Sequence, residues 1–177
     1  MAASLEGAFL HRAQRFEEAL PRLEEARRMN ANFWLIRVDL AETYAGLGRM
    51  EEALAEARVA RSISNDSTWA IASEITQLAH SNQRAQARAL LEQLLHRATE
   101  RYVPPYDIAV ASIGLDDAEG AILWLRRAYE ARDPKTAFLG ITANTTWRSI
   151  QGRPEFADLL TRMNYGAHLE LNLSSQG

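Results

Sequence analysis

Apolar residues recur along most of the chain at spacings of three and four, which is typical of helices that bury one face. Residues 34–45 and 50–63 show the pattern clearly, and Gly-Leu-Gly-Arg at 46–49 between them predicts a turn. Alanine, the strongest helix former, is abundant, whereas the 177 residues include only nine glycines and five prolines. The sequence therefore predicts an all-α fold.

A repeat of 34 residues organises these predicted helices. The segment FEEALPRLEEA begins at residue 16, and related segments begin at residues 50, 84 and 118. Small residues coincide in this register, and the two clearest columns are Ala19, Ala53, Ala87 and Ala121, then Ala26, Ala60, Leu94 and Ala128. Small residues allow two antiparallel helices to pack closely. Because one pair cannot bury its apolar stripe alone, the pairs are expected to stack.

This pattern resembles the tetratricopeptide repeat family, in which each unit is a helix–turn–helix. The second unit matches best, at Leu40, Ala41, Tyr44, Gly48, Ala53 and Ala60. The resemblance implies a right-handed superhelical solenoid of about four units, at residues 1–33, 34–67, 68–101 and 102–133. The column in which the family often has proline differs here, and holds Ala31, Asn65, Thr99 and Asp133.

The pattern changes after the fourth unit. Pro134 ends the preceding helix, since proline disfavours helical geometry in the residue before it. A further helix is predicted from Pro154, with Phe156, Leu159 and Leu160 on one face. Residues 134–165 are therefore predicted to cap the solenoid, and residues 166–177 to form a flexible tail. The order of these segments resembles the C-terminal region of bacterial multidomain regulators.

The N-terminal end of the repeat is apolar. Ser4 is a candidate N-cap for the first helix, and Leu5, Phe9 and Leu10 follow it. Terminal repeats usually carry a polar outer face. These residues therefore predict either that the chain is a fragment of a longer array or that this end self-associates as a homo-oligomer.

Motifs for catalysis are missing from the sequence. It contains no cysteine, its four histidines are far apart, and it lacks a phosphate-binding glycine loop, an HExxH motif and a GxSxG motif. We therefore predict no catalytic residue, no metal and no cofactor, with an enzyme as a remote alternative. The net charge of −3 disfavours nucleic-acid binding. No apolar run is long enough to span a membrane, and no signal peptide is evident, which predicts a cytoplasmic protein.

A solenoid of helix pairs presents a concave groove lined by the first helix of each unit. In this register the predicted peptide-binding groove consists of Val38, Asp39, Glu42, Trp69, Ala72, Thr76, Tyr106, Asp107 and Val110. The lysine and asparagine that the family's carboxylate clamp requires are not in these columns. We predict a scaffold in bacterial regulation that binds a protein or peptide segment with apolar and basic residues. A small-molecule sensor is the alternative, and for Trp69 and Tyr106 packing between units remains an alternative role.

Overall fold

A computed structural model describes residues 2–139 and 146–165; the predicted tail at 166–177 lies outside the described residues. The described residues contain helices and no strand, which confirms the all-α fold class. Four helix pairs follow one another along the chain. They are α1 (Ala2–Arg12) with α2 (Phe16–Met29), α3 (Trp34–Gly46) with α4 (Met50–Ile63), α5 (Thr68–His80) with α6 (Arg84–Glu100), and α7 (Pro105–Gly114) with α8 (Ala118–Glu130). The second helix of every pair begins 34 residues after that of the preceding pair.

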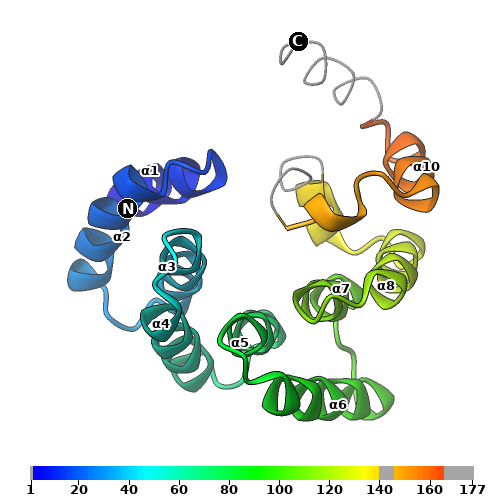
Figure 1. Ribbon diagram of the computed structural model, residues 1–177, viewed down its shortest axis with the longest axis horizontal. Coiled ribbons are helices and arrows are strands. Elements are labelled where there is room, and N and C mark those ends of the chain that lie inside the picture. The colour runs from blue at the N-terminus through cyan, green and yellow to red at the C-terminus, as the bar shows by residue number, and fades with distance from the viewer. Residues whose placement is uncertain (1, 140–145, 166–177) are drawn as a thin grey trace.

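The pairs stack into a curved array, which Figure 1 shows as an open arc. Each helix packs against its pair partner, and the first helices α1, α3, α5 and α7 also contact one another in sequence. In Figure 1, α5 and α7 lie on the inner side of the arc, and α6 and α8 lie outside them. The first helices therefore form the concave face. The N-terminal helix begins at Ala2, two residues before the candidate cap Ser4.

The alanine columns form the helix crossings of the core. Ala19, Ala53, Ala87 and Ala121 are each 0% exposed. A third small-residue column begins at Gly7, where an added Cβ would lie 2.7 Å from Leu23 Cγ. Side chains of these sizes are therefore required by the close approach of the two helices in a pair.

The turns within the pairs share one backbone feature. Gln14, Gly48, Asn82 and Asp116 all have positive φ, between 58° and 75°, and they occupy the same position in successive units. Glycine adopts this left-handed conformation without cost, and asparagine and aspartate tolerate it. Each turn therefore reverses the chain in the same way, although its residue type varies.

The C-terminal segment packs against the fourth pair. It includes the short helices η1 (Pro134–Phe138) and η2 (Arg148–Ile150), followed by α10 (Pro154–Arg162). Trp147, Ile150 and Phe156 are each 0% exposed and share a core cluster with residues of α7 and α8. These side chains cover apolar surface of the last pair.

Replacing Ala53 or Ala87 with leucine is expected to lower the free energy of unfolding by about 1–3 kcal/mol, because three extra carbons must enter a filled crossing. Urea denaturation of each variant measures the change. Ala55→Leu and Ala89→Leu are matched controls on exposed positions of the same helices. Wild-type stability in both core variants would show that the repeat register is wrong.

Candidate binding groove

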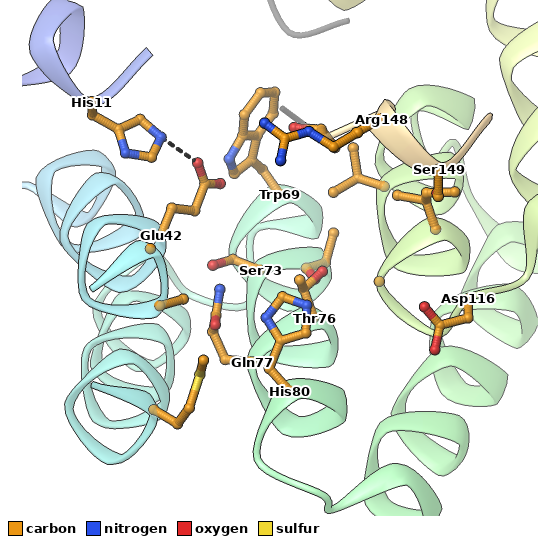
Figure 2. Close-up of a pocket in the computed structure, with 18 of the residues that line it drawn as sticks. His11, Glu42, Trp69, Ser73, Thr76, Gln77, His80, Asp116, Arg148 and Ser149 are labelled. Atoms are coloured by element: carbon orange, nitrogen blue, oxygen red, sulfur yellow. Dashed lines mark hydrogen bonds and ion pairs between the residues drawn. The ribbon is translucent and has the colours of Figure 1, made fainter. Parts of the chain in front are cut away.

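The concave face contains a cavity of about 640 Å³. Side chains from α1, α3, α5 and α7 line it, together with residues 146, 148 and 149 of the C-terminal segment (Figure 2). Six of the predicted groove residues line this cavity: Glu42, Trp69, Ala72, Thr76, Asp107 and Val110. Asp39 and Tyr106 line a smaller neighbouring cavity of about 80 Å³.

Val38 lies outside both cavities, so its placement in the groove is wrong. It is 2% exposed and packs in a cluster with Ala60 and Ala70. The physical reason is the curvature of the stack, which turns this position of α3 toward the junction with the next unit. Val38 therefore contributes to the unit-to-unit core and offers no surface to a ligand.

Aromatic rings form one wall of the groove. The Trp69 ring stacks on Tyr106 with 6.1 Å between ring centroids, and the Tyr106 ring meets the edge of Trp147 at 5.7 Å. Tyr106 is 2% exposed, whereas Trp69 is half-buried and lines both cavities. Trp69 thus combines the two roles that the sequence left open, because its ring stacks on Tyr106 of the next unit and the residue also lines both cavities. Tyr106 is mainly a core residue.

Asp107 lies at the cavity wall but is already neutralised. Its carboxylate is 2.6 and 2.7 Å from Lys135 Nζ and accepts a hydrogen bond of 2.6 Å from Thr68 Oγ1. Burial raises the pKa of Asp107, while the attraction of Lys135 partly offsets that rise. With 1% exposure, this side chain cannot serve as the open acidic contact that the sequence suggested. Its charge instead holds η1 against α5 and α7.

Lys135 also contacts the aromatic wall. Its Nζ atom lies 4.8 Å from the centroid of the Trp69 ring. The carboxylate of Asp133, 2% exposed, accepts hydrogen bonds from the backbone N–H groups of Tyr106 and Lys135. These charged contacts fix the start of the C-terminal segment beside the groove.

An acidic cluster forms the opposite wall, where α1 meets α3. His11 Nε2 lies 2.9 Å from Glu42 Oε2, and His11 Nδ1 lies 3.1 Å from Thr43 Oγ1. The Thr43 hydroxyl donates to the carbonyl of Asp39 at 2.7 Å, so its oxygen can accept a hydrogen bond from His11. A protonated imidazolium, which donates from both ring nitrogens, fits this arrangement.

The pKa values of this cluster agree with that geometry. Burial lowers the pKa of His11, but the hydrogen bond and negative charge of Glu42 outweigh it and the net shift is upward. Burial and the neighbouring charge of Glu42 raise the pKa of Asp39 to about 6. Two acidic side chains that line the large cavity remain exposed to solvent: Glu42 is 39% and Asp116 is 77% exposed, although each has a basic partner.

The sequence did not predict that Thr146, Arg148 and Ser149 of the C-terminal segment line the cavity. Arg148 Nη2 donates a hydrogen bond of 3.2 Å to Gln14 Oε1, although the two residues are 134 positions apart. No local pattern marks such a contact. Ser73 and Gln77 were also missed, and their signal was present: they are polar residues at buried positions of α5.

Metal binding finds no support in the described ranges, where no group of three or more His, Cys, Asp or Glu side chains could hold an ion. Across the same ranges, no helix combines the length and apolar character that crossing a membrane requires.

Comparison with known proteins gives one match. Residues 10–72 match the family model described as tetratricopeptide repeat. Searches of curated proteins and of solved structures found no match. Tetratricopeptide repeats generally mediate protein–protein interactions and are generally not catalytic. The matched residues contain the α3/α4 pair, and the left-handed turn position of that pair recurs in the other three pairs. Residues 10–72 therefore contain tetratricopeptide repeats, and the later helix pairs continue the same 34-residue period.

Proposed function

We propose that this protein is a scaffold that binds a peptide or helical segment of a partner protein in its concave groove. The observation that carries the proposal is the cavity of about 640 Å³ on the concave face, with the half-buried Trp69 beside it. This volume accommodates several side chains of a bound segment. A stiff, half-buried aromatic side chain at a cavity wall is typical of an anchor point in protein interfaces.

The charges of the groove favour a segment with an apolar residue next to arginine or lysine. Glu42 lines the cavity and stays 39% exposed while only its Oε2 contacts His11, so a cation there gains a charge-assisted hydrogen bond. Asp116 lines the cavity farther along and pairs with Arg84 at 2.8 Å. Asp107 adds little, because Lys135 already neutralises it. The proposed basic contact therefore centres on Glu42.

Two substitutions test this groove with a peptide selected on the wild-type protein from a displayed random library. Trp69→Ala should speed dissociation of that peptide and weaken binding by about 2 kcal/mol or more. Glu42→Arg should slow association and reduce its dependence on salt. Surface plasmon resonance at low and high salt separates the two effects.

The matched controls lie on exposed positions outside the cavity. Tyr102→Ala removes an aromatic ring that is 72% exposed, and Glu51→Arg reverses a charge on α4. Both should bind the peptide as the wild type does. Unchanged affinity in Trp69→Ala and Glu42→Arg would mean that the peptide binds elsewhere, on the convex face or the C-terminal segment.

A small-molecule sensor in a bacterial cytoplasmic regulator is the second candidate, and one observation favours it. Thr146, Arg148 and Ser149 of the C-terminal segment line the cavity in addition to the first helices. They make it more enclosed than a groove formed by the helix pairs alone. A metabolite library screened by thermal shift tests this candidate. A compound that raises the melting temperature of the wild type but not of Trp69→Ala would favour the sensor over the scaffold.

The N-terminal helix supports a separate proposal of self-association. Leu5 is 61% exposed and Phe9 is 70% exposed, whereas Leu10 packs against the buried cluster that contains Leu23 and Leu40. The residues that occupy the position of Phe9 in later units, Thr43, Gln77 and Ala111, are 0–1% exposed. Phe9 thus lies on the face that covers a neighbouring unit elsewhere in the stack. A second copy of the chain can cover it in the same way.

Light scattering tests this association. The wild type is expected to form dimers at high concentration, and Phe9→Glu is expected to remain monomeric because a carboxylate cannot be buried in an apolar contact. Tyr129→Glu changes an exposed aromatic residue on α8 and should dimerise as the wild type does. A strictly monomeric wild type would contradict the proposal.

A further inference from the structure

Two polar side chains in the cavity wall lack a hydrogen-bond partner. Ser73 is 4% and Gln77 1% exposed, and neither Ser73 Oγ nor Gln77 Oε1 has a partner among the described residues. The two residues lie one turn apart on α5, and both line the 640 Å³ cavity. Figure 2 shows them directed toward the space between α3 and α5.

The other buried polar groups nearby are satisfied. Glu74, on the same helix, pairs with Arg58 and Arg61. Thr43, in the facing wall, is bonded to His11 and to the carbonyl of Asp39. A buried polar atom without a partner costs stability, and an apolar side chain of the same shape would not. Ser73 and Gln77 therefore differ from these neighbours in having buried polar atoms without a hydrogen-bond partner at the cavity wall.

The chemistry of the Gln77 amide selects the group that can satisfy it. The amide presents one acceptor oxygen and one donor nitrogen side by side. A carboxylate only accepts and a guanidinium only donates, so each leaves one half of the amide unpaired. The negative charge of Glu42 in the facing wall further disfavours a carboxylate. An amide group offers both a donor and an acceptor, and the Ser73 hydroxyl can bond either.

We infer that Ser73 and Gln77 form a subsite for an amide group of the bound segment. This inference rests on the proposed peptide-binding function and names what is recognised beside the Trp69 anchor. The amide has two possible sources: the N–H and C=O of one extended backbone residue, which point to the same side, or the side chain of asparagine or glutamine. Backbone recognition would make this part of the groove tolerant of sequence.

The decisive variants are Gln77→Met and Ser73→Ala. Because each removes an unpaired buried polar atom, we expect melting temperatures at or above that of the wild type. The displayed-library peptide should nevertheless bind Gln77→Met about tenfold more weakly or worse, since its amide loses its partner in a buried site. Gln93→Met and Ser62→Ala, on exposed positions of α6 and α4, should change neither property.

Changes in the peptide identify the source of the amide. Loss of binding on N-methylation of one backbone amide assigns the subsite to the backbone. Loss on replacing one Asn or Gln with leucine assigns it to a side chain. In either case the same change should have no further effect on Gln77→Met, because the partner amide is already gone.

The outcomes separate the subsite from the function on which it rests. If binding depends on Trp69 but not on Gln77, the subsite is wrong and the groove function stands. If Gln77→Met melts below the wild type, the Gln77 amide is satisfied in the free protein and the subsite is again wrong. If Trp69→Ala binds the peptide with unchanged affinity, the proposed groove function is wrong.

A probe that needs no peptide tests the subsite directly. In heteronuclear NMR spectra, N-methylacetamide is expected to shift the side-chain NH₂ resonances of Gln77 and to leave those of Gln93 unchanged. Sodium acetate and methylguanidinium at equal concentration should shift the Gln77 resonances less. Equal shifts with all three probes would overturn the inference.

Discussion

Replacing Lys135 with methionine is expected to lower the free energy of unfolding by on the order of 3 kcal/mol, because it leaves the buried carboxylate of Asp107 without its cation. The Lys135 ammonium contacts both Asp107 oxygens, and Asp107 is 1% exposed. Among the described residues, the only other hydrogen bond to that carboxylate is donated by Thr68 Oγ1. Chemical denaturation followed by circular dichroism measures the loss.

The loss should depend on pH with a defined sign. Burial already raises the pKa of Asp107, and removal of Lys135 raises it further. A carboxyl group with a raised pKa in the folded state favours folding at low pH, and this contribution disappears as pH rises. The deficit of Lys135→Met should therefore shrink as the solution is acidified.

Two further variants serve as controls for this prediction. Arg162→Met breaks the exposed pair with Asp158, 2.9 Å apart, and should cost less than about 1 kcal/mol. The double variant Lys135→Met/Asp107→Leu should recover stability relative to Lys135→Met, because no unpaired buried charge remains. Equal losses in Lys135→Met and Arg162→Met would show that the contact carries little energy.

Asp39→Asn is expected to stabilise the protein by about 2 kcal/mol near neutral pH and to have little effect below pH 4. Burial and the charge of Glu42 raise the pKa of Asp39 from 3.8 to about 6. Neutral Asp39 therefore favours the folded state, and that contribution is lost as pH rises from about 4 to 6. Asparagine stays neutral and should remove this decline from the stability curve.

His11 acts in a neighbouring pH range and can be separated from Asp39. Its raised pKa means that the protonated ring stabilises the fold below its ordinary pKa of 6.5, and this contribution is lost as pH rises through the folded pKa. His11→Gln should make the free energy of unfolding less dependent on pH above about pH 6, and should leave its decline between about pH 4 and 6 unchanged. Denaturation curves of both variants across pH 3–9 test the assignment, and an unchanged slope in Asp39→Asn would contradict it.

Local periodicity was sufficient to predict the helices and their crossings. The burial of Ala53 and Ala87 could be predicted from small residues that recur every 34 positions. Each of these alanines lies at the crossing of two helices of one pair, so its environment depends on nearby sequence. The sequence also contains a signal for the left-handed turn position. Gly48, Asn82 and Asp116 are spaced by 34 residues, and all three residue types tolerate that conformation. Gln14 obscured the pattern, as glutamine shows no preference for positive φ.

The groove was harder to predict because it depends on how units are rotated and on segments far apart in sequence. Val38 and Asp107 share repeat columns with residues that line the cavities, yet curvature buries Val38 and Lys135 neutralises Asp107. The contact between Arg148 and Gln14 joins the two ends of the array. Such contacts have no periodic signal, so residue spacing alone cannot reveal them.

Lys135 is the only lysine in the sequence, so the chain has a single side-chain amine. That amine is held by Asp107 and stands over the Trp69 ring. Its contacts with the Asp107 carboxylate and the Trp69 ring restrict the approach of an acylating reagent to this amine, whose side chain is 26% exposed. Acylation of Lys135 is therefore expected to be fastest when η1 detaches. The rate at which this amine is labelled can be followed by mass spectrometry. It reports how often the C-terminal segment detaches from the α7/α8 pair in the unmutated protein.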